Sequence, residues 1–303
     1  ISEVQRRMMT TAPDANVHAV AVEGTFDDCQ ALVKAMFNHH AFRDRVSLSG
    51  VNSINWARIV AQTVYYFTAA AALGAPHRKV AFTVPTGNFG DVYAGYVAHK
   101  MGLPVDRLVV ATNVNDILAR TFATGTYEVR GVVATASPSM DIQVSSNFER
   151  LLFDAYKRDA GAVRGLMNSL AQSKRFSVSA HALEAMRGLL AAGRADEQES
   201  AATIRAWMRE ASYCADPHTA VALAVAEKEA RDPAIPMVVL STAHPAKFPD
   251  AVRAACGHTP ALPDWVGDLN ARPERVIVLP ADQTKVEQFV ASASRAAHEG
   301  AAA

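Results

Sequence analysis

The segment PTGNFG at residues 85–90 could bind a phosphate group through its backbone N–H groups. It follows an apolar, β-rich run at 80–84 and precedes a helical pattern at 92–101, and Gly87 and Gly90 can adopt φ > 0. In such a strand–turn–helix unit the unpaired N–H groups point one way, and the helix dipole adds partial positive charge. Phosphate is the usual ligand there. Taken alone, the segment is more typical of a plain strand–helix connection.

A second group of polar side chains precedes or begins a long, mostly apolar helix predicted over 54–73. Its members are Asn52, Ser53, Asn55 and Arg58. An arginine beside free helical N–H groups suits an anion, because the guanidinium and the helix dipole both carry positive charge. The same residues could instead form a capping cluster. The sequence therefore offers two anion-suited helix starts, and for each a structural explanation stays open.

Two further positions could carry chemistry. Thr242 follows an apolar strand predicted over 237–241, and the carboxyl ends of strands are where open α/β sheets place ligand contacts. His218 lies in the first turn of a helix that Asp216 caps and Pro217 opens. A histidine at this position could be catalytic but is more often structural. Asp91, directly after the glycine segment, suits the N-cap or first turn of its helix.

The elements that must position these residues are those of an α/β protein. Apolar, β-branched runs predict strands at 17–22, 80–84, 107–112, 237–241 and 276–279. Residues 121–131 are predicted as a loop. From 160 to 232 we expect no strand, and the periodicity indicates helices at 163–173, 180–192, 197–211 and 218–230. Thr25 is predicted to cap a helix that runs to about Asn38.

These elements predict an open, mostly parallel twisted sheet flanked by helices. We expect residues 1–135 to form part of a central region with a phosphate-binding loop. A mostly helical insert is predicted over 136–235. The segment 236–303 is expected to complete the central domain with further α/β structure.

Composition narrows the functional classes. Among 303 residues, 30 basic side chains balance 30 acidic ones, so no global field recruits nucleic acid or an anionic membrane. No apolar run reaches the roughly 18 to 20 residues of a membrane span. Cys29, Cys214 and Cys256 are widely spaced without a CxxC pattern, which favours buried free thiols in a cytoplasmic protein over a metal site.

Six blocks, in order and across nearly the whole chain, resemble the threonine synthase family in its longer, bacterial and fungal branch. They are GTFDDCQALVKAMF (24–37), VNSINWARIVAQTVYYF (51–67), PTGNFGDVYAGYVAHKMGLP (85–104), SPSMDIQVSSNFERLLFDAY (137–156), YCADPHTAVA (213–222) and STAHPAKF (241–248). The resemblance implies a fold-type II, tryptophan synthase β-like enzyme of threonine biosynthesis. It implies a pyridoxal-phosphate-dependent lyase, monomeric or homodimeric, that converts O-phospho-L-homoserine and water into L-threonine and phosphate.

The resemblance also assigns roles to residues already singled out. It places the cofactor phosphate on the amides of Gly87, Asn88, Phe89 and Gly90, with Asp91 beside them, and places Thr242 at the pyridine nitrogen. It gives the substrate phosphate to Ser53, Asn55, Arg58 and the side chain of Asn88. No metal is implied.

One departure from the family concerns the lysine that forms the Schiff base with the cofactor. In the family it lies in a Phe-Lys-Asp segment upstream of the block that resembles ISEVQRR, and an SGDTG-like loop lies upstream as well. Neither occurs here, and the lysines present stand in other contexts: Lys34, Lys79, Lys100, Lys157, Lys174, Lys228, Lys247 and Lys285.

Because the chain also lacks a starting methionine, we expect it to be the carboxyl-terminal part of a longer enzyme. On this expectation the catalytic lysine precedes Ile1, an N-terminal domain is absent, and the chain alone is inactive and binds the cofactor weakly at most. Two alternatives stay open. One is a non-catalytic module that binds small phosphorylated ligands. The other is a different fold-type II lyase such as a dehydratase, which the NSINWAR block and its Arg58 oppose.

Overall fold

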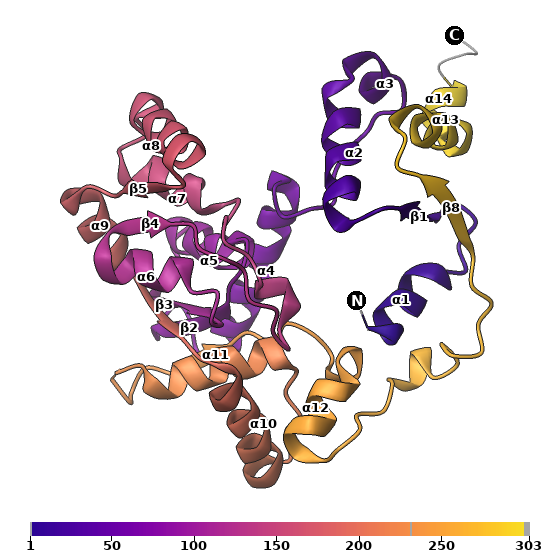
Figure 1. The fold of residues 1–303 in the computed structure, drawn as a ribbon. Helices are drawn as coiled ribbons and strands as arrows, with labels where there is room; N and C mark the ends of the chain where they lie inside the picture. The colour runs from indigo at the N-terminus through magenta and orange to yellow at the C-terminus, as the bar shows by residue number, and fades with distance from the viewer. Residues whose placement is uncertain (1, 231, 300–303) are drawn as a thin grey trace. The chain divides into compact units, whose positions relative to one another are not determined.

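The structure, a computed structural model, describes residues 2–230 and 232–299 (Figure 1). The chain forms two compact units, one of residues Val51–Ala261 and one of residues Ile1–Gly50 with Leu262–Ala303. Each is described separately. Among the described residues, no helix is both long enough and apolar enough to cross a membrane.

The Val51–Ala261 unit is built on a four-stranded parallel sheet in the order β6-β3-β2-β7. The strands are β2 (Val80–Pro85), β3 (Val105–Thr112), β6 (Leu190–Arg194) and β7 (Met237–Val239). β2 is buried along almost its whole length, which explains its unbroken apolar sequence, because a parallel sheet is covered on both faces. The predicted α/β class with a parallel sheet flanked by helices is confirmed.

Helices cover both faces of this sheet (Figure 1). On one face α4 (Trp56–Ala72) and α5 (Gly90–Lys100) contribute Ile59, Tyr66, Val92 and Ala94 to a core with Phe82 and Leu108. On the other face α11 (Pro217–Lys228) packs Val221 and Val225 against Val109 and Ala111. Neighbouring residues of β3 thus alternate between two cores, as the pleat of a strand requires. α10 (Glu197–Ala211) and α12 (Pro249–Cys256) lie outside α11.

The segment 160–232 is not free of strands, and that prediction was wrong. It contains β5 (Arg175–Ser177) and β6, which belongs to the main sheet. β6 reads Leu-Ala-Ala-Gly-Arg and lacks the β-branched residues that mark a strand. A Cβ on Gly193 would lie 2.8 Å from Val225 Cγ1, so a small residue is needed where α11 crosses. The small residues of β6 let α11 pack closely, and because they are not β-branched they gave no sequence signal for a strand.

The prediction of a loop at 121–131 was also wrong in part. α6 (Ile117–Thr124) extends into it, and β4 (Thr126–Glu128) pairs antiparallel with β5. Tyr127 of β4 stacks on Phe176 of β5 with ring centroids 4.7 Å apart, and on Phe148 at 5.5 Å. Phe148 begins α7 (Phe148–Ala155), which α8 (Ala160–Ser173) and α9 (Ala180–Arg187) follow. Aromatic stacking stabilises β4 and β5, because strands of only three residues form few other packing contacts.

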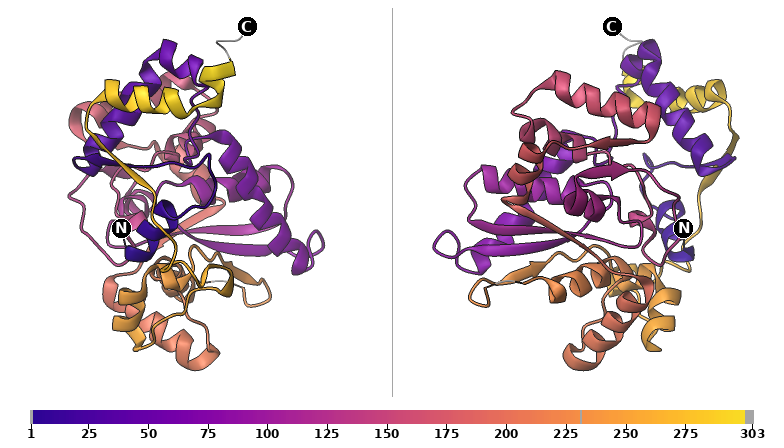
Figure 2. Two further views of the ribbon diagram at one scale, coloured as in Figure 1. Left: turned by 90° about the vertical axis from the view of Figure 1, so that its right-hand side faces the viewer. Right: turned by 60° about the vertical axis from the view of Figure 1, so that its left-hand side comes forward.

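The second unit joins the two ends of the chain. β1 (Ala19–Glu23) pairs in parallel with β8 (Val276–Pro280). α2 (Phe26–Asn38) contacts α13 (Gln283–Ala293), and Figure 2 shows these indigo and yellow helices side by side. Its other helices are α1 (Glu3–Thr10), α3 (His40–Arg45) and α14 (Arg295–Glu299). Thr25 caps α2 as predicted, since its side chain accepts a hydrogen bond from the Asp28 N–H.

This division differs from the predicted boundaries at 135/136 and 235/236. β7 joins the main sheet as expected, whereas β8 pairs with β1 in a separate two-stranded sheet. Short 3₁₀ turns occur in the connections at η1 (Pro138–Met140), η2 (Pro245–Lys247) and η3 (Asp264–Val266). Residues 1–50 and the last part of the chain therefore make a unit of their own.

Candidate functional site

The loop from Thr86 to Phe89 links β2 to α5 at the carboxyl edge of the sheet. Phe89 is the N-cap of α5, has φ 63°, and makes no side-chain capping hydrogen bond. The expectation that Gly87 and Gly90 supply positive φ was wrong, because Phe89 is the residue of this loop in the left-handed region. A bulky residue rarely adopts this conformation, and such positions cluster at ligand sites.

The two glycines are needed instead because other residues of the protein lie too close to leave room for a Cβ. A Cβ on Gly87 would lie 2.6 Å from the main-chain oxygen of Ser139. A Cβ on Gly90 would lie 2.8 Å from the Cβ of Ser53. The second contact joins the start of α5 to the residues just before α4. The two predicted anion-suited helix starts therefore lie next to each other.

Residues of the segment 145–147 donate hydrogen bonds to main-chain oxygen atoms of the loop. The Ser145 hydroxyl donates to Gly87 O at 2.7 Å. Asn147 donates to Asn88 O twice, from its backbone N–H at 3.1 Å and from Nδ2 at 3.0 Å. The backbone N–H groups of 87–90 have no acceptor within the ranges 2–230 and 232–299. The loop thus presents bare amides at a helix start, the arrangement that binds phosphate.

The residues before and at the start of α4 adjoin this loop. Asn55 is the N-cap, and its side chain accepts from Ala57 N at 3.0 Å. Asn147 Nδ2 lies 3.4 Å from Ser53 Oγ, so one amide group touches both helix starts. Arg58 donates to Val51 O at 2.9 Å and is exposed. Asn52 accepts from the Ser53 hydroxyl at 3.2 Å. Capping and anion binding are therefore compatible here, since the Asn55 side chain caps the helix while the Arg58 guanidinium stays exposed.

Asp91 is the second residue of α5, and its carboxylate is directed at α4. The Tyr66 hydroxyl lies 2.8 Å from Asp91 O and 3.2 Å from Asp91 Oδ1. Burial raises the pKa of Asp91 to about 6, against the lowering effects of the Tyr66 hydrogen bond and the Arg58 charge.

Thr242 is exposed at the same edge of the sheet, three residues after β7 ends. Its N–H donates to Thr219 Oγ1 at 3.0 Å. The next N–H, of Ala243, donates to Asp216 Oδ2 at 3.3 Å. The start of α11 therefore fixes the backbone at Thr242, and the threonine side chain stays exposed.

Asp216 and His218 form a buried pair that anchors this edge. His218 Nδ1 lies 2.9 Å from Asp216 Oδ1, and the Ser139 N–H donates to His218 Nε2 at 3.3 Å. The ring is thus held between the Asp216 carboxylate and the Ser139 N–H, one at each ring nitrogen. Burial alone would raise the pKa of Asp216, but hydrogen bonds from His218 and Thr219 hold it below its usual value. These contacts favour the structural interpretation of His218.

Sequence reasoning did not find Asn147 or Ser139. Asn147 is fully buried, and its partners lie 59 and 94 positions away along the chain. Ser139 closes on Gly87 from η1. No local pattern marks either role, because each depends on contacts between distant segments. The only sequence signal was the resemblance carried by the block at 137–156.

The chain is similar to known proteins along nearly its whole length. The family described as "Threonine synthase, C-terminal" matches residues 219–290. The threonine synthase of Pseudomonas aeruginosa is 50% identical over 291 residues, which cover 96% of this chain and 62% of that protein. The one from Eremothecium gossypii is 45% identical over 300 residues, with 90% and 58% covered.

Solved threonine synthase structures are similar to the chain as well. A crystal structure of PLP-bound threonine synthase from Brucella melitensis superposes with a TM-score of 0.93 at 59% identity, covering 97% of this chain and 63% of that one. The yeast enzyme gives a TM-score of 0.87 at 38% identity, with 97% and 62% covered. The chain thus spans about 62% of the length of such relatives. With its α/β sheet, its glycine loop and these likenesses, the chain belongs to the threonine synthase family.

Proposed function

We propose that this chain supplies the phosphate-binding part of a threonine synthase, a lyase that converts O-phospho-L-homoserine and water into L-threonine and phosphate. The observation that carries the proposal is the contact between Gly90 and Ser53, where an added Cβ would lie at 2.8 Å. This contact brings two helix starts together, and the reaction needs two phosphoryl groups held side by side, one on the cofactor and one on the substrate. The PLP-bound relative from Brucella melitensis supports the cofactor.

The residues present fit pyridoxal phosphate. Bare amides at 87–90 and the positive end of α5 suit the phosphate, and the two close glycine contacts hold the loop against Ser139 and Ser53. We assign the cofactor phosphate to Gly87, Asn88, Phe89 and Gly90, with Asp91 in the adjoining turn. Thr242 would contact the pyridine nitrogen through its exposed hydroxyl. When bound, the cofactor supplies an electron sink for proton removal at Cα and Cβ of the substrate.

The substrate phosphate is assigned to Ser53, Asn55, Arg58 and the side chain of Asn88. A guanidinium forms charge-assisted hydrogen bonds with phosphate, and Arg58 is exposed in the first turn of α4, shortly after Ser53, which packs against Gly90. Ser53 Oγ and Asn88 O share the Asn147 amide as a hydrogen-bond partner. Asn147 would therefore fix the distance between the two phosphate sites without contacting either ligand.

The cellular setting is part of the proposal. A cytoplasmic enzyme is supported by three free, half-buried cysteines, which suit a reducing compartment. Balanced charge speaks against nucleic acid as a partner. A monomer or homodimer is the assembly we expect.

Arg58→Ala tests the substrate site in the enzyme encoded by the complete reading frame. We expect KM for O-phospho-L-homoserine to rise roughly 10- to 100-fold, because a charged hydrogen bond to phosphate is lost. The measurement is steady-state release of phosphate. Arg209→Ala is the control, since Arg209 is exposed and paired with its neighbour Glu210. An Arg58→Ala enzyme with the KM of the control would remove Arg58 from the site.

A further inference from the structure

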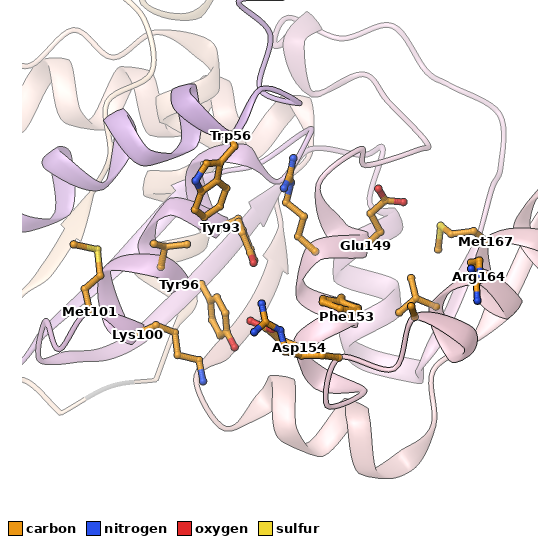
Figure 3. A pocket seen from close by; sticks show the side chains of 15 residues that line it. Trp56, Tyr93, Tyr96, Lys100, Met101, Glu149, Phe153, Asp154, Arg164 and Met167 are labelled. Carbon is orange, nitrogen blue, oxygen red and sulfur yellow. The ribbon is translucent and has the colours of Figure 1, made fainter.

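A pocket of about 760 Å³ lies between the start of α4, α5, α7 and α8, within the Val51–Ala261 unit (Figure 3). Its volume falls within the range of small-molecule sites, roughly 300 to 1,000 Å³. Its lining contains none of the residues assigned above to cofactor or substrate. It is therefore a second candidate site, on a face of α5 that the glycine loop does not use.

Aromatic rings make up much of the pocket wall. Figure 3 shows Trp56, Tyr93 and Tyr96 facing Phe153 across the opening. Tyr93 and Tyr96 stack with centroids 5.6 Å apart, and Trp56 is 49% exposed, with the Arg150 guanidinium carbon 5.8 Å from the centroid of its ring. Rings arranged in this way favour a planar, apolar group, which gains both buried area and stacking.

The charges in the pocket are predominantly positive. The lining contains four cationic side chains, Lys100, Arg150, Arg158 and Arg164, and two acidic ones, Glu149 and Asp154. Asp154 and Arg158 offset each other in part, since the Asp154 carboxylate lies 3.8 Å from Arg158 Nε. Lys100 and Arg164 form no ion pair with any described residue. An excess of two positive charges remains, which attracts a dianion.

The charges and rings meet at Tyr96. Lys100 Nζ lies 5.3 Å from the centroid of the Tyr96 ring. Figure 3 shows the Asp154 carboxylate beside the Tyr96 hydroxyl, and burial and then this carboxylate raise the pKa of that hydroxyl. Arg158 reaches the same carboxylate. Lys100 and Arg158 thus converge where the aromatic wall ends.

We propose that this pocket binds a nucleoside monophosphate, with the base against the aromatic wall and the phosphate beside Lys100 and Arg158. A phosphomonoester carries about two negative charges at pH 7, which matches the charge excess of the lining. A base and ribose fill the length of a pocket that a lone inorganic anion would leave largely open. The proposal is independent of the assignment of the glycine loop.

The test uses the fluorescence of Trp56, one of three tryptophans in the chain with Trp207 and Trp265. We expect AMP to quench the emission with a Kd below about 1 mM, adenosine to bind at least tenfold more weakly, and phosphate alone to give no quenching. Trp56→Phe should abolish the signal and Trp207→Phe should keep it. Lys100→Glu and Arg158→Glu should each raise the Kd about tenfold or more, as loss of a charged contact requires.

Arg209→Glu is the matched charge reversal outside the pocket and should leave the Kd unchanged. Circular dichroism melts of each variant establish that it is folded. The proposal is overturned if AMP gives no saturable quenching up to about 10 mM, or if adenosine binds as well as AMP. It is also overturned if Lys100→Glu behaves like the Arg209→Glu control. AMP binding that disappears in Gly87→Val but survives Lys100→Glu would place the nucleotide at the glycine loop instead.

Discussion

The glycine loop, residues 87–90, depends on two positions where a side chain larger than hydrogen would clash with a neighbouring segment. At Gly90 the absence of a side chain lets α5 start against Ser53, and at Gly87 it lets the loop pass Ser139. Phe89 takes the left-handed conformation between them, and its ring is buried. The site therefore depends on three adjacent constraints at the residue scale, and each can be tested by a single substitution.

We predict that Gly90→Ala destabilises the protein by about 1 to 3 kcal/mol, because the new Cβ would lie 2.8 Å from Ser53 Cβ and must push the two helix starts apart. Urea unfolding measures the change. Gly165→Ala is the control, since nothing lies within 4 Å of a Cβ at this position in α8. It should be neutral or stabilising by up to about 1 kcal/mol. Equal effects of the two substitutions would contradict the close contact.

Asp91 makes stability depend on pH. Its folded pKa is raised to about 6, above the value of about 3.9 in unfolded chains, so the native state holds the proton more tightly. The stabilisation by protonation is present at low pH and is lost as pH rises from about 4 through 6. Asp91→Asn keeps the shape and an acceptor for the Tyr66 hydroxyl without the charge.

We therefore expect Asp91→Asn to be more stable than the unmodified protein by about 1 to 2 kcal/mol at pH 8 and to show no gain at pH 4. Thermal or urea unfolding at the two pH values measures this. Tyr66→Phe is a useful companion, since it removes the hydrogen-bond donor and leaves the titrating group. A gain for Asp91→Asn that is the same at both pH values would show that the carboxylate is not buried as described.

At the scale of elements, the sequence predicted helix starts and strands correctly where they depend on interactions between residues close together in the chain. Asp216 caps α11 and Pro217 opens it, as predicted, because capping and a fixed φ act within one helical turn. β2 and β3 were found because they are long and apolar. β6 was missed because Ala and Gly replace β-branched residues where α11 packs. The start of α5 was only half predicted, since a phenylalanine at positive φ has no sequence signature.

At the scale of the whole molecule, the pairing of distant segments was beyond the reach of local patterns. β1 was predicted as a strand, but its pairing with β8 joins Ala19 to Val276 and creates a unit from the two chain ends. Similarly, the segments 53–58 and 87–91 were predicted to bind anions, whereas Asn147, which hydrogen-bonds to both segments, was not singled out. Residue types indicate what a segment is able to bind, but tertiary contacts decide which segments meet.

The central claim is that the amides of residues 87–90 receive the phosphate of a pyridoxal-type cofactor. The most direct measurement is the change in backbone amide NMR shifts on titration with pyridoxine 5′-phosphate, which has no aldehyde to react with lysines, and with pyridoxine as its phosphate-free control. We predict that the largest shifts fall on Gly87, Asn88, Phe89 and Gly90, and only with the phosphate ester. Shifts of equal size with pyridoxine, or shifts centred elsewhere in the chain, would contradict the claim.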